Sequence, residues 1–347
     1  MAGSLRRQWR AVGFVALCVV CVAAGSGYVV HSRARHEALT QAAALLPTAP
    51  AESVAAVEAQ PHVLFRNLAT AAQAGFTALA PLGAPDGPRQ ITGYPCVRLY
   101  MAAGHGLCLA EQRDDPFGAP YRARFFGPDL RTTADLPLAG LPSRASVSRD
   151  GRLGASTVFV NGDSYAATAF STRTTLYDMA AGTSLGDLET FAAFKAGKRI
   201  QSADLNYWGV TFDPAGANRF YATLGTAGHT YLVEGDVAAR TVKVLRDGVE
   251  CPSVSPDGTR IAFKERVSGG ILDVKWRLSV LSLDTLEAHP LAETRNVDDQ
   301  AEWLDGATVL YSVESDIYAV PADGRGAPRL FTARADSPAV LAVPVTR

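Results

Sequence analysis

The sequence has no excess of charge of either sign. Lysine and arginine number 33 against 34 for aspartate and glutamate, which gives a formal net charge of -1 across 347 residues. Proteins that bind nucleic acid through the phosphate backbone need a basic surplus, so this class of partner is excluded. With 48% hydrophobic residues, the chain is long and apolar enough to bury a sizeable core.

The residues of common catalytic and metal sites are also scarce or wrongly placed. The six histidines are scattered along the chain, and no Cys-x-x-Cys pair occurs after the first 30 residues, which argues against a zinc site. The segment Gly182-Thr183-Ser184-Leu185-Gly186 matches the pattern of a hydrolase nucleophile elbow, but that elbow requires a strand that leads into a helix. Here we expect strands on both sides, and therefore a plain turn. We predict no metal, no cofactor and no catalytic nucleophile.

Long apolar runs are missing except at the N-terminus. Residues 11–30 are uncharged and follow three arginines at positions 6, 7 and 10, a length that matches the hydrocarbon core of a membrane. The apolar run continues past the small residues at 22–24, which favours an uncleaved signal-anchor over a cleaved signal peptide. The arginine bias predicts residues 1–10 in the cytosol and the rest outside it. Residues 31–61, rich in alanine and proline, are expected to form a linker.

Helical periodicity is absent after residue 61, and short β-type runs separated by turn residues replace it. The clearest turn, Pro256-Asp257-Gly258, has weaker copies whose glycines are at 106, 151, 216 and 306. Successive turn glycines are separated by 45, 65, 42 and 48 residues, and three of these gaps match a four-stranded propeller blade. The long gap predicts a polar surface insertion at residues 191–204.

This repeat predicts an all-β fold, a six-bladed β-propeller over residues 62–347. Residues 62–92 supply only three strands for the first blade, and the C-terminal segment 338–345 is expected to add the missing innermost strand. Such a closure leaves no blade with an unpaired inner edge.

One stretch of the chain also resembles a known family. Pro252-Ser253-Val254-Ser255-Pro256-Asp257-Gly258-Thr259-Arg260-Ile261-Ala262-Phe263 and the later Ser279-Val280-Leu281-Ser282-Leu283 look like the WD40-like repeat of TolB-type propellers. Segments 206–212, 220–224, 250–253 and 298–303 resemble membrane-anchored TolB-like proteins of actinobacteria. The resemblance implies an extracytoplasmic propeller without established chemistry. The chain lacks the α/β domain that precedes the propeller in TolB itself.

Cysteine is sparse, and only Cys96, Cys108 and Cys251 lie beyond the predicted membrane segment. In an extracytoplasmic compartment Cys96 and Cys108, on neighbouring strands, are a candidate disulfide. Their register in a simple hairpin would place them on opposite faces, so either a bulge brings them together or both are buried free thiols. Cys251 belongs to another blade and is expected to be unpaired.

Polar and aromatic residues recur about eight positions before each turn glycine, where the inner strands begin. With their neighbours they form a candidate binding ring at the mouth of the propeller funnel: Arg98, Asn206, Trp208, Glu250, Asp298 and Asp299. The alternative is that these residues are polar because the channel is wet.

Three functions remain open at this stage. The leading prediction is a non-catalytic binding or scaffold module at the cell envelope, single-pass in the membrane, whose partners are other envelope proteins or a small ligand in the funnel. The second is an envelope hydrolase or lyase that uses Glu250 and Asp298 as paired carboxylates. The third is a glycan or peptide sensor in which Trp208 and Trp303 act as stacking platforms, which requires both rings to be exposed.

Overall fold

The computed structural model describes residues 13–14, 16–22, 25–27, 50–70, 72–112, 119–162, 165, 170–216, 218–270 and 273–342. Contacts divide the chain into two compact units, the first comprising Met1–Pro47 with Thr70–Gln73 and the second comprising the remainder. In the first unit the described residues between 13 and 27 are helical. Among all described residues, none belongs to a helix with the length and apolarity needed to cross a membrane. The predicted segment 1–10, part of the predicted segment 11–30 and residues 31–49 of the predicted linker 31–61 lie outside the described residues.

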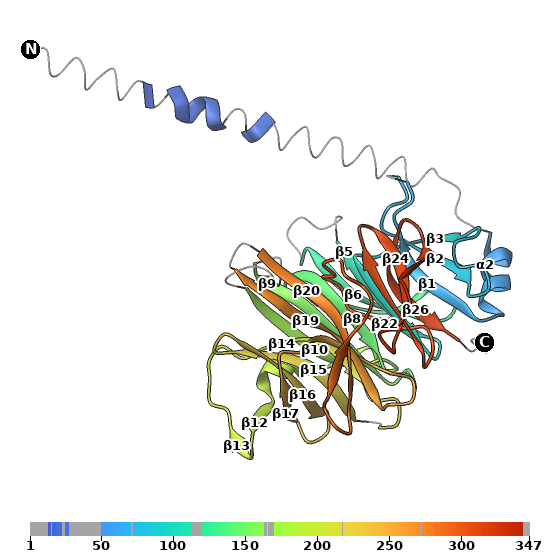
Figure 1. The fold of residues 1–347 in the computed structure, drawn as a ribbon. Helices are drawn as coiled ribbons and strands as arrows, with labels where there is room; N and C mark the ends of the chain where they lie inside the picture. Colours follow the sequence, from blue (N-terminus) through green and yellow to red (C-terminus); the bar gives the residue numbers. More distant parts are fainter. Residues whose placement is uncertain are drawn as a thin grey trace, which may run out of the picture. The chain divides into compact units, whose positions relative to one another are not determined.

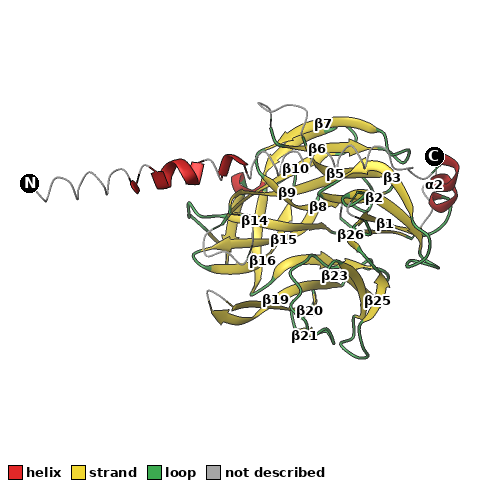
Figure 2. Cartoon of the chain, turned by 90° about the horizontal axis from the view of Figure 1, so that it is seen from above, coloured by secondary structure: helices red, strands yellow, loops and turns green. Residues whose placement is uncertain are grey.

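The second unit is an all-β propeller of six sheets (Figures 1 and 2). Blade one contains β26 (Ala335–Leu341), β1 (His62–Asn67), β2 (Phe76–Pro81) and β3 (Gln90–Pro95), in that order from the centre outward. Blade two contains β4 (Arg98–Ala102), β5 (His105–Glu111), β6 (Tyr121–Phe126) and β7 (Thr132–Leu138). Blade three contains β8 (Leu141–Val147), β9 (Leu153–Asn161), β10 (Ser171–Asp178) and β11 (Thr183–Asp187).

The remaining blades follow the same order. Blade four contains β14 (Asn206–Phe212), β15 (Arg219–Thr226), β16 (His229–Asp236) and β17 (Thr241–Asp247). Blade five contains β18 (Glu250–Val254), β19 (Arg260–Gly270), β20 (Asp273–Ser282) and β21 (Ala288–Pro290). Blade six contains β22 (Glu302–Trp303), β23 (Thr308–Val313), β24 (Asp316–Pro321) and β25 (Arg329–Thr332). The repeat in the sequence therefore predicted the fold class and the number of blades correctly.

The ring closes through the C-terminal strand, as expected. Strand β26 pairs antiparallel with β1, with Val63 opposite Val340 and Asn67 opposite Ala335. The strand begins three residues before the predicted segment 338–345, whose last three residues lie outside the described ones. The innermost strands contact one another around the ring in the order β26, β4, β8, β14, β18, β22 and back to β26.

The expected surface insertion at 191–204 is instead partly built into blade four. Strand β12 (Ala192–Lys195) pairs in parallel with β17, and β13 (Lys198–Arg199) pairs with β12. Phe191 and Ala193 are buried in the core of this blade together with Leu188 of the short 3-10 helix η1 (Leu188–Thr190). The two lysines, Lys195 and Lys198, lie at the exposed tip, and the buried Phe191 and Ala193 before them anchor the segment.

Two smaller expectations also need correction. The end of the predicted linker forms helix α2 (Ala51–Glu58), whose Val57 is buried against the cluster that contains Leu79 and Cys96. In the segment that resembles a nucleophile elbow, Gly182 lies in the turn between β10 and β11, as expected, while the other four residues belong to β11, the outer strand of blade three. Ser184 is exposed there, and its hydroxyl accepts a hydrogen bond from the Gly186 amide.

Candidate functional site

The predicted ring residues do come together around the channel, where the inner strands begin. Arg98, Glu250 and Asn206 are the first residues of β4, β18 and β14, respectively. Trp208 is the third residue of β14. Asp298 and Asp299 precede β22. The spacing of eight residues before each turn glycine therefore identifies one end of the inner strands in five blades.

Most of this end of the channel is buried rather than open. Trp208 is 2% exposed and stacks on Tyr165, with ring centroids 5.4 Å apart. Phe159, Phe170 and Trp276 belong to the same cluster. Trp303, the other tryptophan of the proposed stacking pair, is 4% exposed and donates from Nε1 to the Ser253 carbonyl. Neither ring is available to stack on a ligand, so the sensor hypothesis based on Trp208 and Trp303 is wrong.

Asn206 has a structural position as well. Its side-chain oxygen accepts hydrogen bonds from the Thr172 amide at 3.0 Å and from the Ser171 hydroxyl at 3.1 Å. Its amide nitrogen donates to the Asp204 carbonyl. These bonds tie the start of β14 to β10 of the preceding blade, so Asn206 holds two blades together.

A buried lysine, which sequence reasoning missed, dominates the surroundings of Glu250 and Asp298. Lys264 of β19 is fully buried, and its Nζ donates to Asp298 Oδ1 at 2.5 Å. The ammonium also lies 4.4 Å from the centre of the Trp276 ring, a cation–π contact. Because β19 pairs Lys264 opposite Glu250, a period-two reading of that strand would have placed the lysine beside the carboxylates.

The electrostatics follow from burial and from these pairs. Burial alone would lower the pKa of Lys264, but the Cys251 thiol and the Asp298 carboxylate outweigh it and raise that pKa. Burial raises the pKa of Glu250, which is only 4% exposed, and Lys264 opposes that rise. Glu250 lines neither of the two cavities found among the described residues. Glu250 and Asp298 thus share a lysine, an arrangement that stabilises charge; Glu250 and Lys264 are buried, whereas the Asp298 side chain is exposed.

Cys251 is a buried free thiol, as expected for a cysteine far from the other two. Its backbone adopts φ +48°, and its amide donates to Thr223 Oγ1 at 2.9 Å. Burial raises the pKa of its thiol. Gly209, at φ +64°, lets β14 approach it, since a Cβ on Gly209 would lie 2.7 Å from the Cys251 Cα.

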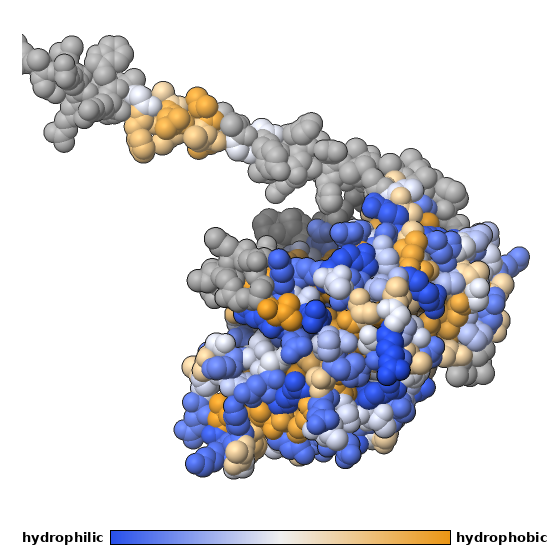
Figure 3. Space-filling model, viewed as in Figure 1, coloured by the Kyte–Doolittle hydropathy of each residue, from blue (hydrophilic) through white to orange (hydrophobic). Residues whose placement is uncertain are grey.

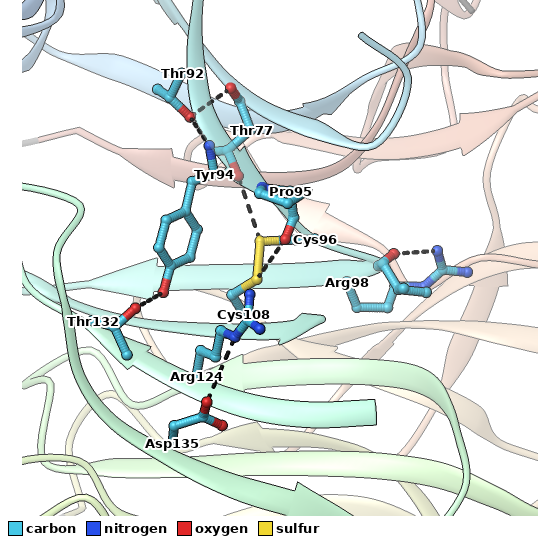
Figure 4. Close-up of a disulfide and its surroundings, with 11 residues drawn as sticks. Thr77, Thr92, Tyr94, Pro95, Cys96, Arg98, Cys108, Arg124, Thr132 and Asp135 are labelled. Carbon is cyan, nitrogen blue, oxygen red and sulfur yellow. Dashed lines mark hydrogen bonds and ion pairs between the residues drawn. A yellow bond between two sulfur atoms is a disulfide. The ribbon is translucent and has the colours of Figure 1, made fainter. Parts of the chain in front are cut away.

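Cys96 and Cys108 form a disulfide, with their Cα atoms 5.5 Å apart (Figure 4). The β4–β5 register pairs Cys108 with Leu99, so Cys96 is not in the hairpin. It lies in the connection between β3 and β4, where its amide donates to the Gly75 carbonyl. The disulfide therefore joins an interblade connection to the second strand of blade two, and no bulge is needed.

The larger cavity lies at the opposite end of the inner strands. It has a volume of about 450 Å³, and all six blades line it. The lining includes Val340 of blade one, Tyr100 of blade two, Arg149 of blade three, Thr211 of blade four, Val254 of blade five and Glu302 of blade six. We call this cavity the mouth cavity. The residues of the predicted binding ring do not line this cavity, and Arg98 and Asp299 of that ring line the smaller cavity next to it.

A buried carboxyl group lies on the wall of the mouth cavity. The Tyr100 hydroxyl is 3.0 Å from Glu302 Oε1 and 3.1 Å from Oε2, so it donates to this carboxyl group across the channel. Burial raises the pKa of Glu302 to about 8, although the Tyr100 hydrogen bond opposes that rise. Near neutral pH the group is therefore largely protonated.

The wall also carries hydroxyl groups from three blades. Ser146, Thr211 and Ser253 come from blades three, four and five. The Thr211 hydroxyl accepts a hydrogen bond from the Val254 amide and so bridges two inner strands. The mouth cavity is thus a mixed polar and apolar surface that can recognise a ligand by hydrogen bonds and shape.

A comparison with a solved structure supports the propeller fold. A chain in the crystal structure of the nidogen/laminin complex matches with a TM-score of 0.54 and 12% identity, over 81% of this chain and 99% of that one. A chain in the crystal structure of the tricorn protease matches with a TM-score of 0.45 and 10% identity, over 77% of this chain and 29% of that one. No family model and no curated protein matches the sequence.

Proposed function

We propose that this protein is a non-catalytic binding or scaffold module of the cell envelope, whose recognition site is the mouth cavity. The observation that carries the proposal is that all six blades contribute to the wall of this 450 Å³ cavity. Ligand sites in folds of radial symmetry form where the elements converge, because side chains from many segments can reach one ligand there.

The cellular setting is part of the proposal. Residues 11–30 would act as a signal-anchor that holds the propeller outside the cytosol, and the disulfide between Cys96 and Cys108 is compatible with such an oxidising compartment. The WD40-like stretch at 252–263 supports a TolB-like type of propeller. Its partners would be other envelope proteins or a small ligand.

Capture of partners from a detergent extract of the envelope tests this proposal. We would immobilise residues 50–347, and compare the unchanged protein with Val254→Trp, which fills the mouth cavity. The matched control is Leu330→Trp on the outer strand β25, where Leu330 is 44% exposed. We expect Val254→Trp to lose at least nine-tenths of the captured partner, and Leu330→Trp to retain it. Equal capture by both variants would exclude the mouth cavity as the site.

A further inference from the structure

A second, smaller cavity of about 40 Å³ lies deeper in the channel. Its wall includes Tyr100, Gln300 and Glu302, which also line the mouth cavity, so the two cavities share a wall. Arg98 of blade two and Arg144 of blade three complete it from the other side. The volume suits a carboxylate group or a few water molecules.

Arg98 has no carboxylate partner in this wall. Its Nε donates to the Ser143 carbonyl at 2.8 Å and its Nη1 to the Val97 carbonyl at 3.0 Å. Within the described part of the chain, none of the recorded ion pairs within 4.0 Å involves Arg98. Burial and the neighbouring Arg144 lower its pKa, as expected for a desolvated cation that is not fully compensated.

Arg144 has spare hydrogen-bonding capacity at the same place. The residue is 7% exposed, and its Nε is buried without a hydrogen-bond partner. Its Nη1 donates to the Ser143 carbonyl at 2.9 Å and lies 3.7 Å from Asp299 Oδ1, a long ion pair. The Nε–H of this charged group is buried without an acceptor, which costs free energy that a bound acceptor would recover.

The charges around the small cavity do not balance. Three arginines, at 66, 98 and 144, act on this part of the channel, against the two aspartates 299 and 336. Burial raises the pKa of Asp336, so this carboxyl group neutralises the arginines less effectively. Lys264 is shared by Asp298 and Glu250, and burial raises the pKa of Glu302 to about 8. Among Arg98 and the four charged groups that act on it, positive charges therefore outnumber negative ones by one.

We propose that the channel binds the carboxylate of a ligand between Arg98 and Arg144, with the rest of the ligand in the mouth cavity. This inference rests on the proposed function, because it names the ligand class for the same channel. A carboxylate presents two acceptor oxygens to guanidinium donors and carries one negative charge, which matches the surplus. A phosphate dianion carries a larger negative charge, which exceeds this surplus and is repelled more strongly by Asp299.

Calorimetric titration of residues 50–347 with acetate at pH 6.5 and constant ionic strength tests the proposal. Acetamide, which has nearly the same shape without the charge, is the matched ligand control, and inorganic phosphate is the competing anion. We expect acetate to bind at least tenfold more tightly than either. Equal binding of acetate and acetamide, or tighter binding of phosphate, would overturn the assignment.

Variants locate the site. Arg98→Met is expected to weaken acetate binding by tenfold or more, because a charge-assisted hydrogen bond is lost. Arg329→Met, at an exposed arginine of β25, should leave it unchanged. Should Arg98→Met fail to fold, Arg98→Lys keeps the charge and should bind acetate more weakly than the unchanged protein without losing it. Acetate affinity that is identical in the folded variant and in the unchanged protein would refute a site at Arg98.

The two proposals fail in different ways. If acetate does not bind but Val254→Trp still abolishes capture, only the proposal of a carboxylate site is refuted. If acetate binds at Arg98 and the mouth variants capture partners normally, the channel binds an anion and the proposed recognition site is wrong.

Discussion

At the scale of single residues, the most consequential group is the buried carboxyl of Glu302. Its pKa is raised to about 8 in the folded protein and is near its ordinary value of 4.5 in the unfolded chain. Between these two pH values the unfolded state releases a proton that the folded state retains. Stability from this residue is therefore fully present below about pH 4.5 and declines as the pH rises towards 8.

Glu302→Gln removes this titration and keeps the shape of the side chain. We expect the midpoint of thermal unfolding of the unchanged protein to fall relative to the variant between pH 5 and pH 8, since only the unchanged protein must keep an acid protonated. Measuring both midpoints at several pH values gives the difference directly. A difference that does not change with pH would show that Glu302 is not held protonated.

Gly209 makes a second prediction, about backbone packing. Gly209→Ala places a Cβ at 2.7 Å from the Cys251 Cα and also imposes a side chain at φ +64°. We expect a loss of about 2–4 kcal/mol in the free energy of unfolding, which combines the left-handed backbone with an overpacked contact. Urea unfolding measures it.

Gly228→Ala is the matched control for this contact. Gly228 has φ +75° but nothing within 4 Å of its Cβ position, so it carries the backbone cost alone, about 1 kcal/mol. Equal losses at both glycines would mean that the close approach of β14 and Cys251 contributes nothing.

Residue chemistry was only partly predictable from the sequence. The recurrence before each turn glycine correctly located Glu250 and Asp298 at one end of the channel, because the spacing is a property of the repeated strand. It did not reveal Lys264, since a lysine at a fully buried position of β19 contradicts ordinary burial preferences. Nor did it reveal the pairing of Tyr100 with Glu302, whose residues are 202 positions apart.

At the scale of elements, the disulfide joins the connection between β3 and β4 to strand β5. Cys96 precedes β4 and Cys108 lies within β5, with Thr77, Tyr94 and Thr132 around it (Figure 4). The sequence brought the two cysteines together as candidates but could not settle their register, because it did not show that β4 begins only after Cys96.

Removing this cross-link should destabilise the propeller. The double variant Cys96→Ala, Cys108→Ala is expected to lose about 3 kcal/mol, the entropy of closing a loop with a sequence separation of 12, when unfolded in urea. Reductant should lower the stability of the unchanged protein and leave that of the double variant unaffected. A reductant effect on both would point to a different cause.

Closure of the ring by β26 is the second element-scale feature. Deleting residues 335–347 removes the innermost strand of blade one and exposes the edge of β1. We expect loss of cooperative thermal unfolding in the truncated protein, followed by circular dichroism. Deleting only 343–347, which follow β26, is the control and should leave the transition in place. A cooperative transition without residues 335–347 would contradict the closure.

At the scale of the whole molecule, the recurring turns predicted the architecture because each blade repeats the same pattern of strands and turns. Glycine recurs at these positions in five blades, with an aspartate in four of them, so the pattern could be recognised even where one copy is weak. The insertion in blade four was misjudged because it occurs only once. The position of the mouth cavity depends on where six chain segments meet, so it cannot be predicted from any single segment of the sequence.

The surface gives little guidance to the partner. On the face shown in Figure 3, polar residues predominate and the hydrophobic ones form small separate patches. A wide apolar docking surface is therefore not visible on that face of the propeller. The likeness to the nidogen/laminin complex, at 12% identity, concerns the fold.

Site-specific photo-cross-linking in cells that produce the full chain tests recognition at the mouth cavity most directly. A benzophenone amino acid would replace Val254 at the mouth in one strain and Leu330 on the outer strand β25 in another. We predict a cross-linked partner from Val254 and none from Leu330. Cross-links from Leu330 alone, or from neither position, would contradict recognition through the mouth cavity.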